Sequence, residues 1–219
     1  MAPPRYKIIL SDLHLGFGPR LPDGSRNLLE EFHYDRQFIE LLRHYSEGEF
    51  ARAEVALILN GDILNHLHTT PGEPDCDRLT EQVALSRTEK ILAGHPECFE
   101  ALADFAKRPG RSIVYIMGNH DMGVAWPKVQ QFLQEKIHPG LKFFLDGYEA
   151  DGLHIEHGNN CVADNRVDLD NLFLTKGERE PVLKMPWGSF FAVHFINPLK
   201  KERPYIGRVF PFKMYITWA

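Results

Sequence analysis

Acidic, amide and imidazole side chains follow four short apolar stretches of the chain. In chain order they form the motifs Asp12-Leu13-His14, Gly61-Asp62, Gly118-Asn119-His120-Asp121 and His157-Gly158. Carboxylate and amide oxygens together with imidazole nitrogens suit divalent manganese, iron or zinc, and the motifs do not choose among these metals. Two such ions in one site can activate water and neutralise the oxygens of a phosphoryl group. The residue types therefore predict a hydrolytic site built on two metal ions.

Each motif stands where a strand is expected to end. The expected strands cover residues 5–11, 55–59, 113–117 and 153–156. Runs of β-branched and aromatic residues that stop at a glycine or a polar residue are typical of strands that end in tight loops. Because such loops hold chemical groups on a rigid scaffold, we expect the four strand ends to supply one site.

The remaining segments predict helices between the strands. Helices are expected over residues 27–45, 79–92, 96–107 and 127–137, a strand over 141–145, a hairpin from Gly147 into 153–156, and a short helix over 167–174. This order favours α/β layers with a mixed sheet. We expect one domain over residues 1–219, with a core over 5–165 and a cap or edge segment over 166–219.

Composition narrows the possible functions. The 219 residues are 43% hydrophobic, which suffices for one large globular domain. The net charge of −5 argues against a general nucleic-acid binder, although Lys200, Lys201, Arg203 and Arg208 could form a local basic patch. No apolar run is long enough to span a bilayer, and the three cysteines suggest no disulfide framework. A cytoplasmic location is therefore expected.

The first two motifs have both a chemical and a structural interpretation. Asp12 and His14 are two residues apart, so in extended backbone both side chains can reach one cation. Alternatively, they are a capping aspartate and a surface histidine. Asp62 has two oxygens and can bridge cations roughly 3.5–4 Å apart, or it caps a helix.

The later motifs leave similar alternatives open. Asn119 offers a neutral oxygen to a metal, or it serves as a turn residue. His120 would lie beside the metals and give a proton, or it is a loop histidine bonded to backbone. His157 ends a strand and is a candidate ligand, whereas His154 is expected to pack or lie on the surface.

Taken together, the four motifs resemble those of the calcineurin-like metallophosphoesterase superfamily over about residues 5–165. The resemblance implies two mixed β-sheets packed face to face, with helices outside. It implies two metal sites, held by Asp12, His14 and Asp62 and by Asp62, Asn119 and His157. His120 would stay off the metals and act on the leaving group. The implied reaction is attack on a phosphomonoester, phosphodiester or diphosphate by a hydroxide shared between the cations.

The chain departs from the superfamily pattern in two places. Where the protein phosphatases of the superfamily carry a second acid after the Gly-Asp motif, this chain has Asn65, which cannot form a charged pair with His120. A protein serine/threonine phosphatase is therefore not expected. The closing Gly-His-x-His motif does not occur after His157. We also weigh an inactive binding module with the same fold.

The apolar end of the sequence, residues 210–219, is expected to mark an incomplete C-terminus. A longer chain would then supply two further histidine ligands. The rival expectation is that His66, His68 or His194 takes their place.

The substrate is suggested only by a distant resemblance. Residues 157–164 are similar to the corresponding segment of UDP-2,3-diacylglucosamine pyrophosphohydrolases, which implies a lipid-linked diphosphate. Aromatic and basic residues between Trp187 and Trp218 could contact lipid, although a hydrophobic cap over the site is the favoured interpretation.

Overall fold

Four parallel strands form the largest sheet of the protein. The structure is a computed structural model that describes residues 3–69, 77–204 and 206. The strands are β1 (Arg5–Leu10), β2 (Glu54–Asn60), β3 (Arg111–Ile116) and β4 (Lys142–Phe144), and they lie side by side in this order. Because all four run in the same direction, the loops that follow β1, β2 and β3 leave from one edge of the sheet.

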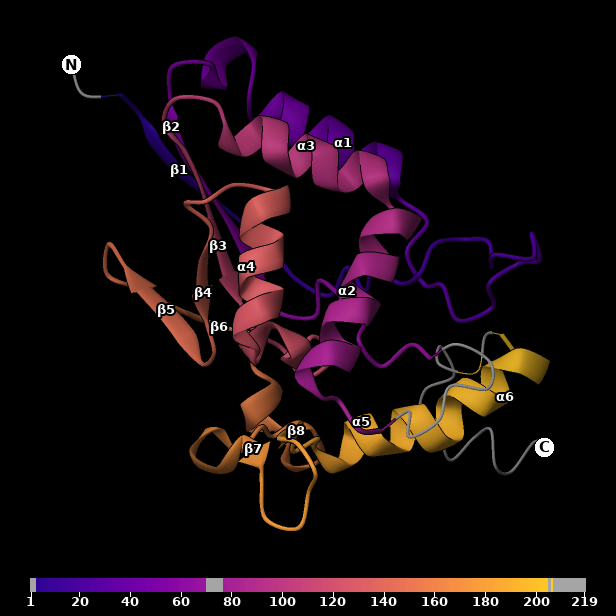
Figure 1. Cartoon of the computed structure of the whole chain (residues 1–219). Coiled ribbons are helices and arrows are strands. Elements are labelled where there is room, and N and C mark those ends of the chain that lie inside the picture. The colour runs from indigo at the N-terminus through magenta and orange to yellow at the C-terminus, as the bar shows by residue number, and fades with distance from the viewer. Residues whose placement is uncertain (1–2, 70–76, 205, 207–219) are drawn as a thin grey trace.

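Helices cover one face of this sheet (Figure 1). They are α1 (Asp35–His44), α2 (Glu81–Gly94), α3 (Pro96–Ala106) and α4 (Pro127–Lys136). The Thr80 hydroxyl accepts a hydrogen bond from the Val83 N–H and begins α2, whereas α3 and α4 begin with a proline that is already set for the first helical turn. The expected helices over 79–92, 96–107 and 127–137 are confirmed.

A β-hairpin packs on the opposite face of the sheet. It consists of β5 (Gly147–Ala150) and β6 (Leu153–Glu156), as expected. Side chains alternate along a strand, so Val114 and Ile116 of β3 meet Ile155 of the hairpin, while Ile113 and Tyr115 join the core beneath the helices. A second antiparallel pair, β7 (Phe173–Leu174) and β8 (Val182–Leu183), lies further along the chain. Parallel and antiparallel sheets surrounded by helices agree with the predicted α/β sandwich.

A helical segment, residues 187–202, follows β8. It comprises α5 (Trp187–Phe191), a π-helical stretch (Ala192–Ile196) and α6 (Asn197–Glu202). Short 3₁₀ turns elsewhere cover Gly48–Phe50, Met122–Ala125, Asn159–Cys161, Ala163–Asn165 and Leu169–Asn171. Among the residues that the structure describes, none lies in a helix long and apolar enough to cross a membrane.

The expected helix over 27–45 is wrong in its first half, because α1 begins only at Asp35. The Asn27 side-chain amide donates to the carbonyl of Gly18 (2.9 Å), and its oxygen accepts from the Leu29 N–H (3.1 Å). The carboxylate of Glu30 accepts the N–H of Phe32 at 2.9 Å. Side chains therefore take backbone groups that a helix would pair internally.

The expected helix over 167–174 is also wrong. A 3₁₀ turn at Leu169–Asn171 is capped by the Asp168 carboxylate, and the chain then extends into β7, where Phe173 pairs with Leu183. The periodicity of residues 167–174 alone could not indicate that β7 pairs with β8, which begins nine residues after the start of β7. The expectations for Cys76, Arg208 and the apolar stretch 210–219 lie outside the described residues.

A buried charged cluster joins the loop after β1 to the helices. Glu30 accepts the N–H groups of Gly16 (3.2 Å) and Gly18 (2.7 Å), and the His95 ring lies between Glu30 (Nε2 to Oε2, 3.3 Å) and Asp35 (Nδ1 to Oδ1, 2.7 Å). Burial alone would lower the pKa of His95, but its two carboxylate partners raise that pKa above the ordinary 6.5. Burial would raise the pKa of Glu30, but His95 and the Phe32 N–H hold it below 4.5. These three residues are called the Glu30–His95–Asp35 cluster.

The cluster predicts a pH window for stability. The raised pKa of His95 stabilises the fold fully below pH 6.5, and this contribution is lost as the pH rises through the pKa of His95 in the folded protein. The lowered pKa of Glu30 stabilises the fold fully above pH 4.5, and this contribution is lost as the pH falls through the pKa of Glu30 in the folded protein. His95→Gln should therefore lower the free energy of unfolding most between pH 4.5 and 6.5. The expected loss is roughly 3–5 kcal/mol, because the substitution removes one partner of a buried charged pair. Urea unfolding of both proteins across pH measures this. An equal loss at pH 5.5 and at alkaline pH would contradict it.

Candidate metal centre

The loops after β1, β2 and β3 are hydrogen-bonded to one another at the carboxyl edge of the sheet. The Asp12 N–H donates to the Gly61 carbonyl (3.1 Å), the His14 N–H to the Asp62 carbonyl (2.9 Å), and the His66 N–H to the His120 carbonyl (3.0 Å). Strand-end loops thus bring Asp12, His14, Asp62 and His120 close together.

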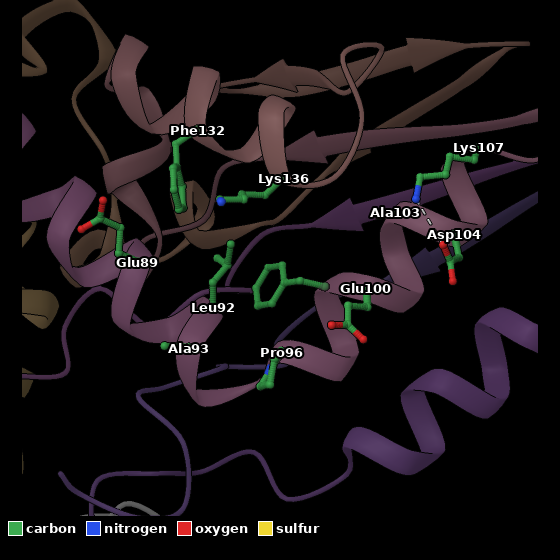
Figure 2. A pocket seen from close by; sticks show the side chains of 11 residues that line it. Glu89, Leu92, Ala93, Pro96, Glu100, Ala103, Asp104, Lys107, Phe132 and Lys136 are labelled. Atoms are coloured by element: carbon green, nitrogen blue, oxygen red, sulfur yellow. Dashed lines mark hydrogen bonds and ion pairs between the residues drawn. The ribbon is translucent and has the colours of Figure 1, made fainter.

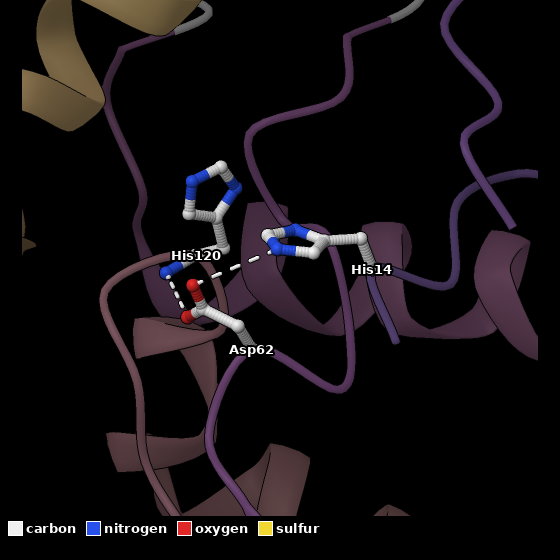
Figure 3. Close-up of side chains that lie close together, drawn as sticks. All are labelled: His14, Asp62 and His120. Carbon is white, nitrogen blue, oxygen red and sulfur yellow. Dashed lines mark hydrogen bonds and ion pairs between the residues drawn. The ribbon is translucent and has the colours of Figure 1, made fainter. Parts of the chain in front are cut away.

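Asp62 lies at the centre of this arrangement (Figure 3). Its Oδ2 lies 3.3 Å from Nε2 of His157 and 3.9 Å from Nε2 of His14, and its Oδ1 accepts the backbone N–H of His120 at 2.8 Å. Two groups of potential ligand atoms meet here, one of His14, Asp62 and His120 and one of Asp12, Asp62 and His157, and within each group the atoms lie within 4.8 Å of one another. Asp62 belongs to both groups, as a bridging carboxylate would. A third group among the described residues, Asp35, His95 and Cys98, belongs to the buried cluster between α1 and α3.

Asp12 and His14 also converge, with 3.8 Å between Oδ1 of Asp12 and Nε2 of His14. Their backbone is unusual, because Asp12, His14 and Asp62 have φ angles of 56°, 52° and 54°. Residues with a Cβ adopt this left-handed region at a cost of about 1–3 kcal/mol, and such strained residues cluster at functional sites. Asp151, in the turn of the β5–β6 hairpin, also has a φ angle of 53°. The left-handed turns at Asp12, His14 and Asp62 place three side chains of neighbouring loops around one point.

The ionisation of these groups fits a cation. The polar interaction with the His14 ring is the main reason that the pKa of Asp12 falls to about 2. Burial opposes ionisation of Asp62, but His157, His120 and His14 outweigh it and lower the pKa of that carboxyl. Burial likewise lowers the pKa of His157, but Asp62 reverses the effect and raises it to about 9. The carboxylates are therefore ionised, and a cation at His157 would replace a proton.

His157 is oriented for ligation by its second ring nitrogen. Its Nδ1 lies 2.8 Å from the carbonyl of Asn60, and because a carbonyl only accepts, Nδ1 carries a proton. The other nitrogen, Nε2, therefore points to Asp62. This is the usual support for a metal-binding histidine, since the outer hydrogen bond fixes both ring orientation and tautomer.

Asp121 holds the backbone of the two loops that carry Asp62 and His120. The sequence did not predict this role. Asp121 is buried, and it accepts the N–H groups of Gly118 (2.6 Å) and Ile63 (2.9 Å) and the hydroxyl of Tyr115 (2.7 Å). Burial and the charge of Asp62 raise its pKa to about 6. The sequence feature that could have indicated this role is the position of Asp121 directly after Asn119-His120. Asp121 thus ties the loop after β2 to the loop after β3.

Residues 187–202 contact these loops as well, in the part of the chain for which a cap over the site is the favoured expectation. The Ser189 hydroxyl donates to the carbonyl of Asn119 (3.1 Å), and the Asn197 amide donates to the carbonyl of Leu67 (2.8 Å). Lys200 forms an ion pair with Glu31 at 2.5 Å. Ser189 thereby anchors the backbone of Asn119, whose side chain is the predicted amide ligand.

The three histidines considered as substitute ligands have other partners. His66 lies between Thr88 (2.9 Å) and the N–H of Gly123 (3.1 Å), and His194 pairs with Asp77 at 3.2 Å. His68 receives a hydrogen bond from Asn65 at 3.1 Å. Within the described part of the chain, none of the three belongs to a group of potential metal ligands.

A separate groove of about 810 Å³ lies on the helical face (Figure 2). Leu92, Pro96, Glu100 and Phe132 are among the residues that line it, and they come from α2, α3 and α4. No predicted metal ligand lines the groove.

Gly61 and Gly118 give the rings and carboxylates of the predicted ligands room, because a Cβ on Gly61 would lie 2.4 Å from the His157 ring. Gly118 provides a test. A Cβ on Gly118 would lie 2.2 Å from Oδ1 of Asp62, so Gly118→Ala should displace the shared carboxylate and lower Mn²⁺ affinity roughly 10–100-fold. Gly147→Ala is the matched control, because its Cβ would lie 3.2 Å from both the exposed ring of His154 and the backbone oxygen of Ile155 and would meet no predicted ligand. Calorimetric titration with Mn²⁺ compares the variants. Wild-type affinity in folded Gly118→Ala would contradict the geometry.

The α/β sandwich and the ligands gathered around Asp62 define a metal-binding α/β protein. A family model of calcineurin-like phosphoesterases matches residues 8–206, so the chain belongs to that family, whose members use divalent metal ions and act on phosphate esters. The match extends beyond the expected core at 165 into the segment that contains α6. No curated protein and no solved structure matches the chain.

Proposed function

We propose that the protein hydrolyses phosphate esters with two divalent cations. One cation is held by Asp12, His14 and Asp62, and the other by Asp62, Asn119 and His157. The observation that carries the proposal is the membership of Asp62 in both the His14–Asp62–His120 group and the Asp12–Asp62–His157 group. The division of the other ligands between the two cations follows the resemblance to the family. Mn²⁺, Fe²⁺ and Zn²⁺ all suit this set of oxygen and nitrogen donors.

The side chains of the protein have two functions in this reaction, binding of the cations and transfer of a proton. When bound, the cations supply a nucleophile at neutral pH and neutralise the phosphoryl oxygens. Asp62 and Asp12 provide the anionic charge that holds the cations, and Asn60 and Asp121 fix the orientation of the ligand loops. His120 lies beside Asp62 and His14, where it exchanges a proton with the departing oxygen.

Hydrolysis of p-nitrophenyl phosphate and bis(p-nitrophenyl) phosphate tests the proposal. The full chain should release p-nitrophenol after reconstitution with Mn²⁺, Fe²⁺ or Zn²⁺, and a chelator should abolish the release. Asp12→Ala is the matched control for contaminating enzymes. Absence of release with all three metals, in a folded protein that binds them, would contradict the enzyme and favour an inactive scaffold with this fold.

The substrate proposed at a finer level is a lipid-linked diphosphate. Support comes from the resemblance of residues 157–164 and from exposed aromatic side chains on residues 187–202, with Trp187 61% and Phe195 49% exposed. Phe191 stacks between these two rings, at 5.2 and 4.9 Å between centroids. Hydrolysis of a diacylated sugar diphosphate in detergent micelles should then exceed that of the same deacylated compound. Equal rates would exclude a role for the lipid.

A further inference from the structure

The side-chain amide of Asn65 has a defined orientation because a backbone group identifies its oxygen. The N–H of Leu67 lies 3.2 Å from Oδ1 of Asn65. A backbone N–H can only donate, so the atom that faces it is the carbonyl oxygen and not the amide nitrogen. Asn65 is buried, with 2% of its surface exposed, so this assignment depends on protein contacts alone.

This orientation determines where His120 carries its proton. Nδ1 of His120 lies 3.3 Å from the same Oδ1 of Asn65. Since that oxygen accepts, Nδ1 must donate and therefore bears hydrogen. In the neutral ring, Nε2 then has the lone pair.

The other end of the amide determines the tautomer of His68. Nδ2 of Asn65 lies 3.1 Å from Nε2 of His68, which must accept because the amide nitrogen only donates. His68 is 1% exposed, and burial lowers its pKa to about 3, so its ring is neutral. The proton of His68 is therefore on Nδ1. A continuous row of defined donors and acceptors links His68, Asn65 and His120.

We propose that His68 is a positioning residue that acts through Asn65 to keep the proton of His120 on Nδ1. Nε2 of His120 is then the atom that exchanges a proton with the leaving group. The inference rests on the proposed phosphoesterase function for its catalytic consequence, whereas the tautomers follow from the hydrogen bonds alone. Asn65 thus replaces the acid of the related protein phosphatases with a neutral but directional partner.

The proton transfer balances without movement of the ring. The reactive ring carries hydrogen on both nitrogens. When the bond from phosphorus to the leaving oxygen breaks, its electron pair stays on that oxygen, which takes the proton from Nε2. The N–H electron pair remains on Nε2, and the ring becomes neutral with its hydrogen on Nδ1. This product is the tautomer that Asn65 already holds, so no reorientation is required.

The tautomers are measured by two-dimensional ¹⁵N–¹H NMR of the full chain loaded with Zn²⁺, which is diamagnetic. Both His120 and His68 should show a protonated Nδ1 and an Nε2 that bears no hydrogen. Hydrogen on Nε2 of either neutral ring would overturn the proposal. If the tautomers are as expected but no ester is hydrolysed, the proposed function fails and the hydrogen-bond assignment stands.

Leaving-group dependence tests the catalytic consequence. His68→Leu removes the acceptor for Asn65, so kcat for phenyl phosphate should fall about tenfold more than kcat for p-nitrophenyl phosphate, which hardly needs a proton. His68→Gln keeps an acceptor oxygen and should restore most of the loss. Zn²⁺ content should stay unchanged in both variants.

His66→Leu is the matched control, because His66 is equally buried in the same loop but bonds to Thr88 and Gly123. Its effect on the two esters should be equal. An equal loss for both esters in His68→Leu would overturn the positioning role, and so would a failure of His68→Gln to restore selectivity. The NMR measurement on the unmutated protein decides the question if His68→Leu does not fold.

Discussion

Asp62→Asn is expected to leave at most one tightly bound divalent cation. Asp62 is the residue that both groups of potential ligands share, and its Oδ2 is the atom nearest to both His14 and His157. Unit charges about 4 Å apart repel by about 4 kcal/mol near a protein surface, and two divalent ions multiply this about fourfold. A neutral amide cannot offset that repulsion. The affinity for the second ion should fall by at least roughly 100-fold.

Elemental analysis after equilibrium dialysis against Mn²⁺ measures this effect. Asp12→Asn is the matched control, because Asp12 belongs to only one of the two groups and should weaken one site while sparing the other. Two equivalents of Mn²⁺ at wild-type affinity in Asp62→Asn would show that Asp62 does not bridge.

His120→Asn should leave metal content nearly unchanged and slow turnover of esters with poor leaving groups by roughly 10²–10⁴-fold. The variant keeps the backbone N–H that Asp62 accepts at 2.8 Å, so the shared carboxylate should stay in place. A good leaving group hardly needs the proton, and its hydrolysis should fall less.

The same variant distinguishes the two possible roles of His120, because a ring nitrogen of this residue lies within 4.8 Å of ligand atoms of His14 and Asp62. Metal content and turnover are therefore measured on the same preparation. Loss of one equivalent of metal from His120→Asn would identify the residue as a ligand and would contradict the role in proton transfer.

The strands and most helices could be predicted because their signals are local. The apolar run at Val55–Leu59 and the prolines at 96 and 127 each determine an element without reference to distant residues. The beginning of α1 was not predictable in this way. It depends on Glu30, whose carboxylate is held by His95 from the junction between α2 and α3, 65 residues away in the sequence.

The convergence of the site was predicted, whereas its supporting contacts were not. Asp12, His14 and Asp62 follow the ends of two adjacent parallel strands, and this adjacency brings them together. His157 follows β6 of the separate hairpin and reaches the site because that hairpin packs on the sheet. The hydrogen bonds of Ser189 and Asn197 come from a segment whose sequence shows mainly aromatic residues. The partnership of Asn65 with His120 required the orientation of a single amide group, which no sequence pattern specifies.

The left-handed backbone at Asp12, His14 and Asp62 lowers the stability of the fold at the same three positions that supply predicted ligands. Glycine adopts this conformation without penalty, so a glycine at any of them would relieve about 1–3 kcal/mol of strain while it removed a ligand. Selection for stability alone would therefore erode the site one residue at a time. Carboxylates and an imidazole at these strained positions are what a cation site would require, and they are present at the expense of stability.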